Sequence, residues 1–199
     1  MPIKTDTEPH TAKADPGAPP DSIFNLAIEQ EHIARAIRKG ANASPAVAMP
    51  GQILQSYCDS LTSLAPRIAL AWIWFGEPGA TLVSPQIVSG RASAYARNLT
   101  IERNWLTEKG PVFRAIDGRR SEIFSISPWS VWKPWRKVAR EHGICSVIAL
   151  QLASSIDQRR GLLVMYSDTD QYFDFLGEQV FRSMADLFSV VLSKESRVD

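Results

Sequence analysis

The sequence is poor in the residues that hold metals and form disulfides. Among 199 residues there are two cysteines, Cys58 and Cys145, and three histidines, His10, His32 and His142. Their positions match no spacing typical of a zinc site, and a single pair of cysteines gives little support to a disulfide. We therefore expect both thiols to be buried or half-buried and to pack as small apolar side chains.

The chain also lacks long apolar runs and any excess of basic charge. Its longest apolar stretches, residues 68–75 and 147–152, are far shorter than the roughly 18 to 20 residues of a membrane-spanning helix. The N-terminal residues contain no apolar segment of the signal-peptide type, so we expect a cytoplasmic protein. Because 22 basic residues are balanced by 21 acidic ones, the net charge of +1 does not favour nucleic-acid binding.

What is present is enough apolar material for one folded domain. Hydrophobic residues make up 45% of the chain and include six tryptophans, which excludes a wholly disordered or fibrous protein. Residues 1–20 differ from the rest, because they hold five of the thirteen prolines and almost no large apolar side chains. This composition predicts a disordered tail.

Apolar residues at helical spacing predict long helices at both ends of the domain. The expected segments are a helix over 21–40, a linker over 41–49, a helix over 52–64 and a helix over 174–193. Short apolar runs between turn residues predict strands. The expected strands are 68–75, 81–89, 121–126, 144–152 and 161–167, with short helices over 93–98, 111–117 and 134–142. This order predicts an α+β domain with one antiparallel sheet.

Several short motifs, in this order, resemble GAF domains. They are Gly110-Pro111 opening a helix, Pro134-Trp135-Arg136, the segment 143–147, and the strand 161–167 before Phe173-Asp174. The resemblance covers roughly residues 52–192, and Gln151 departs from it, since the family often has proline there. The Pro-Trp-Arg segment and the Tyr166-Ser167-Asp168 strand end are most similar to GAF domains found upstream of diguanylate cyclase (GGDEF) domains.

The resemblance implies a GAF-like, profilin/PAS-like fold over residues 50–195. Its single antiparallel sheet would carry the terminal helices on one face, and short helices and loops over a pocket on the other. It implies a non-catalytic sensory domain that binds an unidentified small molecule, needs no cofactor and forms a homodimer. Ligand occupancy would pass through the terminal helices to an output domain or partner. The output domain either belongs to a longer polypeptide or is absent from a sensor that stands alone.

Tryptophans are the main candidates for ligand contact. Alternation along the first strand places Ala69 and Ala71 toward the helices, because small residues suit close helix packing. It places Ile68, Trp72 and Trp74 toward the pocket. A second aromatic cluster precedes a basic residue that can pair with a carboxylate or phosphate. The full set of candidate ligand-binding residues is Trp72, Trp74, Trp129, Trp132, Trp135, Arg136, Cys145 and Tyr166.

Other functions remain open on these residues. The tryptophans could fill the pocket themselves, which would make the domain a ligand-free dimerisation or protein-interaction module. Haem binding would need His142, and bilin attachment would need Cys145, which is followed by serine where histidine is typical. Reduction of free methionine sulfoxide, which some GAF proteins perform, uses a group of reactive cysteines, and this chain has two. An enclosed cavity would favour sensing over interaction.

Overall fold

The computed structural model describes residues 23–43, 49–77, 79–118, 121–126, 133–152 and 160–193. The expected tail (1–20) and residues 44–48 of the expected linker lie outside them. The elements in chain order are α1 (Ile23–Ala43), α2 (Pro50–Leu64), β1 (Ile68–Gly76), β2 (Leu82–Val83), β3 (Ile87–Ser89), α3 (Ser93–Arg97), β4 (Ile101–Glu102), the 3-10 helix η1 (Thr107–Lys109), α4 (Pro111–Ile116), β5 (Ser121–Ser125), α5 (Lys133–Glu141), β6 (Ser146–Leu152), β7 (Arg160–Ser167), α6 (Tyr172–Leu176) and α7 (Glu178–Ser193).

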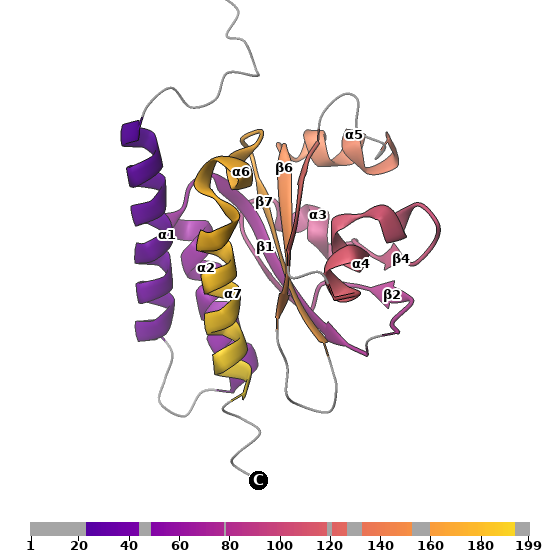
Figure 1. Cartoon of the computed structure of the whole chain (residues 1–199), viewed down its shortest axis with the longest axis horizontal. Helices are drawn as coiled ribbons and strands as arrows, with labels where there is room; N and C mark the ends of the chain where they lie inside the picture. Colours follow the sequence, from indigo (N-terminus) through magenta and orange to yellow (C-terminus); the bar gives the residue numbers. More distant parts are fainter. Residues whose placement is uncertain are drawn as a thin grey trace, which may run out of the picture.

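A five-stranded antiparallel sheet of order β3-β1-β7-β6-β5 forms the centre of the molecule. Helices α1, α2 and α7 lie on one side of it, and α3, α4 and α5 lie on the other, together with a small β2–β4 ribbon (Figure 1). The predicted α+β class and its division of terminal and short helices between the two faces are therefore confirmed. None of the described helices is long and apolar enough to cross a membrane.

The helix side of the sheet is closely packed. Its core, which we call the helix-side core, includes Ile33, Leu54, Cys58, Leu61, Ile73, Ile148, Met165, Phe181 and Phe188. The Tyr57 and Phe188 rings lie 4.8 Å apart, which joins α2 to α7. The hydroxyl of Tyr172 donates a hydrogen bond of 2.9 Å to Glu29 Oε2, so α6 holds the outer helix α1.

The opposite face carries a second cluster, the pocket-side core. It includes Leu70, Trp72, Trp74, Leu99, Phe113, Ala139, Val147, Val164 and Tyr166. Its members come from strands β1, β2, β6 and β7 and from short helices joined by loops. These short elements cover the sheet piecewise, whereas the long helices cover the other face continuously.

Strand β1 follows the predicted alternation only after its first residues. Trp72 and Trp74 lie in the pocket-side core as expected. A register shift between Ile68 and Leu70 breaks the alternation, so Ile68 faces the helices and Ala69 faces the pocket side. The prediction for these two residues was wrong, because a bulge inserts one extra residue and reverses the facing of what precedes it.

Trp74 determines what its neighbour along the strand can be. A Cβ atom added at Gly76 would overlap the Trp74 ring, so the indole lies directly on the Gly76 backbone. Glycine at position 76 therefore leaves room for the Trp74 ring, which is only 5% exposed.

Two predicted elements are divided in the structure. The expected strand over 81–89 forms β2, which pairs with β4 in the separate ribbon, and β3, which pairs with β1. The expected helix over 174–193 is interrupted at Gly177, whose φ of 83° is left-handed and ends α6 before α7 begins. Periodicity alone did not reveal these breaks, because apolar residues continue on both sides of them.

Candidate functional site

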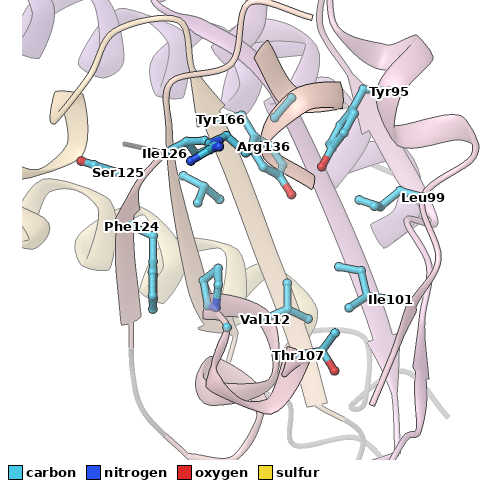
Figure 2. A pocket seen from close by; sticks show the side chains of 14 residues that line it. Tyr95, Leu99, Ile101, Thr107, Val112, Phe124, Ser125, Ile126, Arg136 and Tyr166 are labelled. Atoms are coloured by element: carbon cyan, nitrogen blue, oxygen red, sulfur yellow. The ribbon is translucent and has the colours of Figure 1, made fainter. Parts of the chain in front are cut away.

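A pocket lies between the sheet and the short helices. It offers about 80 Å³ to the centres of water-sized molecules, so it has room for a small molecule. The described residues that line it are Tyr95, Leu99, Ile101, Thr107, Gly110, Pro111, Val112, Phe124, Ser125, Ile126, Arg136, Ala139, Val147 and Tyr166 (Figure 2). The predicted pocket on the face away from the terminal helices is therefore present.

Apolar side chains form most of the wall. Leu99 follows α3, Ile101 lies on β4, Val112 on α4 and Val147 on β6, while the ring of Phe124 on β5 forms one side. Val112 and Val147 are only 5% and 6% exposed, so the strand and helix that carry them are fixed by packing on both sides. The wall suits an apolar body of a ligand.

Polar groups gather at the end of the pocket next to α5. The hydroxyl groups of Tyr95 and Tyr166 both point into the cavity, and the guanidinium of Arg136 lies at the same end (Figure 2). The two tyrosine rings meet edge to face, with centroids 5.8 Å apart and an interplanar angle of 76°. Arg136 and Ala139 are three residues apart on α5 and so share the helix face that lines the pocket.

Both tyrosines keep their protons over the physiological pH range. Burial raises the pKa of Tyr95, and burial together with the Tyr95 phenol raises the pKa of Tyr166 well above its ordinary value. The indole of Trp72 approaches the Tyr166 hydroxyl and lowers its pKa in part. The contact falls short of hydrogen-bond geometry, and the buried Trp72 Nε1 has no hydrogen-bond partner among the described residues.

The loop beneath the pocket is held by Arg103. Its guanidinium donates hydrogen bonds of 3.1 and 2.9 Å to the two carboxylate oxygens of Asp117 and lies 4.4 Å from the centre of the Phe113 ring. The hydrogen bond to Asp117 is the main reason why the pKa of Arg103 is raised further. Thr107, which lines the pocket, donates to the Glu102 carbonyl at 2.6 Å. These contacts fix the lower wall.

The structure brings two of the predicted ligand residues to the pocket, Arg136 and Tyr166. Trp72 and Trp74 are buried in the pocket-side core behind the wall, and neither lines the cavity. The other predicted tryptophans cannot be placed: Trp129 and Trp132 lie outside the described residues, and of Trp135 only the backbone, in α5, is described.

Neither cysteine belongs to the pocket lining. Cys58 is fully buried in the helix-side core, and burial raises its pKa far above the ordinary thiol value. Cys145, half-buried between α5 and β6, also has a raised pKa, first because of burial and then because of Asp170 and Asp168. Both thiols are therefore poor nucleophiles at neutral pH.

Metal and haem chemistry find no support in the described part of the chain. No group of three or more His, Cys, Asp or Glu residues is placed there to hold a metal ion. His142 is exposed at the end of α5, where its ring lies 5.7 Å from that of Tyr95, and it does not line the pocket.

Sequence reasoning missed Tyr95 and Phe124. Tyr95 was visible as the only aromatic residue of a short predicted helix, and Phe124 as the aromatic residue of a predicted strand. Neither has a neighbouring motif, because the pocket assembles residues from eight elements spread along the sequence. Their roles follow from the sheet order, which brings β5, β6 and β7 together in front of α3 and α5.

Comparison with known proteins finds similarity in three dimensions only. No protein-family model and no curated protein matches the chain. The GAF domain region of a protein from Geobacter sulfurreducens is 16% identical, with a TM-score of 0.56, covering 71% of this chain and 94% of that one. The nlh2 GAF domain of A. aeolicus, in an inactive state, is 10% identical, with a TM-score of 0.58 and coverage of 83% and 96%.

The same fold also occurs in an enzyme. The free methionine-R-sulfoxide reductase of Neisseria meningitidis, solved with its substrate, is 13% identical, has a TM-score of 0.58 and matches over 86% of this chain and 93% of that one. At these identities the likeness extends to architecture and not to chemistry. The chain has the GAF fold.

Proposed function

We propose that the chain is a small-molecule-sensing regulatory domain that binds its ligand in the pocket and does not transform it. The observation that carries this proposal is the cavity itself, with an apolar wall and three polar side chains at one end. A ligand-free interaction module would be expected to fill this space with its own side chains. Trp72 and Trp74, the described candidates for such filling, pack behind the wall instead.

The absence of catalysis is part of the same proposal. The fold is shared with a sulfoxide reductase, so the architecture does not decide the question. Against a reductase stand the raised pKa values of Cys58 and Cys145 and their positions outside the pocket lining. Thiolate exchange needs an accessible thiolate beside its substrate, and neither residue offers one.

The sheet provides a short route from the pocket to the terminal helices. Adjacent residues of a strand face opposite sides, so Val147 lines the pocket while Ile148 packs in the helix-side core. Tyr166 and Met165 are related in the same way on β7. Strand β6 contacts α7, so the pocket is linked to that helix through one layer of packing, and this supports signalling through α7.

The partner of this helix is proposed from the sequence resemblance. We propose an output domain such as a diguanylate cyclase in the same polypeptide, and a cytoplasmic homodimer joined through the terminal helices. The dimer is tested by sedimentation equilibrium at tens of micromolar, where a mass of two chains is expected. A mass of 22.1 kDa, that of one chain, would contradict it.

The sensing proposal is tested by asking whether a ligand depends on the cavity. Native mass spectrometry and a visible absorption spectrum of freshly purified protein identify a retained compound, and a thermal-shift screen identifies weaker ones. A ligand at about 100 times its Kd stabilises the native state by about 2.7 kcal/mol, which corresponds to roughly 5–10 °C for a chain of this size.

Two neighbouring substitutions on α5 make the test specific. Ala139→Phe places a ring in the cavity, because Ala139 lines it, and Val138→Phe is the matched control, since Val138 is 42% exposed and outside the lining. We expect the ligand to stabilise the wild type and Val138→Phe but not Ala139→Phe. A ligand that stabilises all three equally would place its site elsewhere and overturn the proposal.

A further inference from the structure

The polar end of the pocket presents hydrogen-bond donors. No aspartate or glutamate is among the described residues that line it, and its single formal charge is the guanidinium of Arg136. A guanidinium has five N–H donors and no acceptor, so Arg136 can serve a protein partner and a ligand together. The remaining polar lining residues point elsewhere: Thr107 is committed to Glu102, and the Ser125 hydroxyl turns away from the cavity (Figure 2).

Trp72 determines which way Tyr166 donates. The two residues are on adjacent strands and on the same face, because Trp72 pairs with Val164 and Tyr166 lies two residues further along β7. An indole N–H is a donor only, so the Tyr166 oxygen can serve it only as an acceptor. A Tyr166 oxygen that accepted from Trp72 would keep its own proton for an acceptor in the pocket.

The unpartnered indole leaves this arrangement incomplete among the described residues. Trp72 is fully buried, and its Nε1 lacks a hydrogen-bond partner among the described residues, which is costly for a buried donor. A small shift of the Tyr166 ring would supply the partner. An acceptor that fixes the Tyr166 hydroxyl from the pocket side would hold the ring in that position.

We propose that the pocket selects a small carboxylic acid in its anionic form, held by Arg136, Tyr166 and Tyr95, with an apolar body against Leu99, Ile101, Val112 and Val147. The inference rests on the proposed sensing function and names its ligand class. Three converging donors match a carboxylate, and the guanidinium adds a charge-assisted hydrogen bond beside any contact it makes within the protein. The cavity, which offers about 80 Å³ to the centres of water-sized molecules, suits a small ligand.

The test compares two probes of the same shape, 4-methylpentanoate and 4-methylpentanamide, by isothermal titration calorimetry. We expect the carboxylate to bind at least about tenfold more tightly, because charge-assisted hydrogen bonds are the stronger ones. Arg136→Gln is expected to remove this preference. Lys137→Gln is the matched control, because it removes the same charge from the next residue, which is exposed and outside the lining.

The outcomes separate the ligand class from the proposed function. Equal binding of acid and amide, both blocked by Ala139→Phe, would overturn the anion preference and leave a ligand pocket. Tighter binding of isobutyl phosphate than of 4-methylpentanoate would overturn the choice of carboxylate. If neither acid nor phosphate binds, the class is wrong, and only a retained compound that Ala139→Phe displaces would save the sensing function.

The role of Trp72 as a positioning residue is tested by a double-mutant cycle on 4-methylpentanoate affinity. Tyr166→Phe is expected to weaken binding about tenfold and Trp72→Phe about threefold. In the Tyr166→Phe background, Trp72→Phe should have no further effect, since it acts only through the hydroxyl. Additive losses would show that Trp72 merely supports the fold, and an unchanged affinity in Tyr166→Phe would overturn the donor assignment.

Discussion

The two faces of the sheet belong to the same strands, but one is closely packed and the other borders a cavity. On the helix side, Leu61, Phe181 and Phe188 are completely buried, and aromatic pairs such as Phe173 and Phe181 meet at 5.1 Å. On the pocket side, Val147, Leu99 and Tyr166 retain 6–9% exposure around a cavity. The difference therefore arises from the covering elements: long helices cover one face without interruption, and short helices joined by loops leave a space on the other.

This contrast separates stability from function within one domain. Close packing is what cores normally reach, so a cavity in an otherwise well-packed protein marks a place where packing serves something else. We expect the closely packed helix-side core to contribute more to the free energy of unfolding than the pocket side does. Substitutions of the same kind on the two faces should consequently have different effects.

The largest difference is expected for leucine truncations. Leu61→Ala, in the helix-side core, should lower the free energy of unfolding by about 2–5 kcal/mol, because it leaves a new cavity among fully buried neighbours. Leu99→Ala should cost about 1 kcal/mol, since Leu99 already borders the pocket and is 9% exposed, so its truncation enlarges an existing space. Urea unfolding of both variants measures this, and equal losses would break the comparison.

Replacing an alanine by a larger residue should also destabilise the helix side more than the pocket side, here by overpacking instead of by leaving a cavity. Ala36→Leu on α1 should destabilise the protein by about 1–3 kcal/mol, because Ala36 is fully buried in the helix-side core. Ala139→Leu on α5 should change stability by less than about 0.5 kcal/mol, since its side chain can enter the pocket. Thermal unfolding of the two variants compares them, and overpacking at Ala139 would argue against an open cavity.

The cysteines extend the comparison to pH. Burial raises the folded-state pKa of Cys58 above its ordinary value of 9.0, so its stabilising effect is complete below pH 9 and is lost as the pH rises, when the unfolded chain releases the proton. This one group contributes a fall of up to about 1.4 kcal/mol per pH unit. Cys58→Ala should flatten the profile between pH 9 and 11 more than Cys145→Ala. An unchanged slope in Cys58→Ala would show that the thiol ionises in the folded protein.

The smallest difference is expected for two arginines. Arg103→Gln should cost about 1–2 kcal/mol, because Arg103 is only 20% exposed, pairs with Asp117 through two hydrogen bonds and supports the pocket loop. Arg38→Gln should cost less than about 0.5 kcal/mol, although its ion pair with Glu31 is as short, at 2.8 Å, since both groups are exposed. Chemical unfolding at low and high salt measures both, and similar losses would contradict the role given to Arg103.

Much of the fold was predictable because its signals are local. The helix starting at Pro111 and the strand ending at Ser167 follow from proline position and apolar patterning, and both occur as expected. The separation of β2 from β3 was not predictable, since it depends on which distant strand each one meets. The bulge near Ile68 was hidden for a related reason, because a register shift leaves no mark in an uninterrupted apolar run.

The pocket was predictable in its place and less so in its residues. The resemblance of the motifs placed it on the correct face, and Arg136 and Tyr166 line it as expected. Trp72 and Trp74, which were also predicted, lie in the pocket-side core and not in the lining, because a large ring on a buried strand fills space behind the wall as readily as it forms the wall. Tyr95 was missed because its hydroxyl becomes a candidate ligand contact only when the fold brings it next to Tyr166.

Because the Trp74 ring contacts the backbone of Gly76, the residue type at one of these positions restricts the residue type at the other. A side chain at position 76 would require a smaller residue at position 74, and a tryptophan at 74 would require glycine at 76. Homologues should therefore exchange these residues as a pair and rarely singly. The pair is a compact sequence signature of the relatives that keep this side of the molecule, recognisable where overall identity is too low to align the rest.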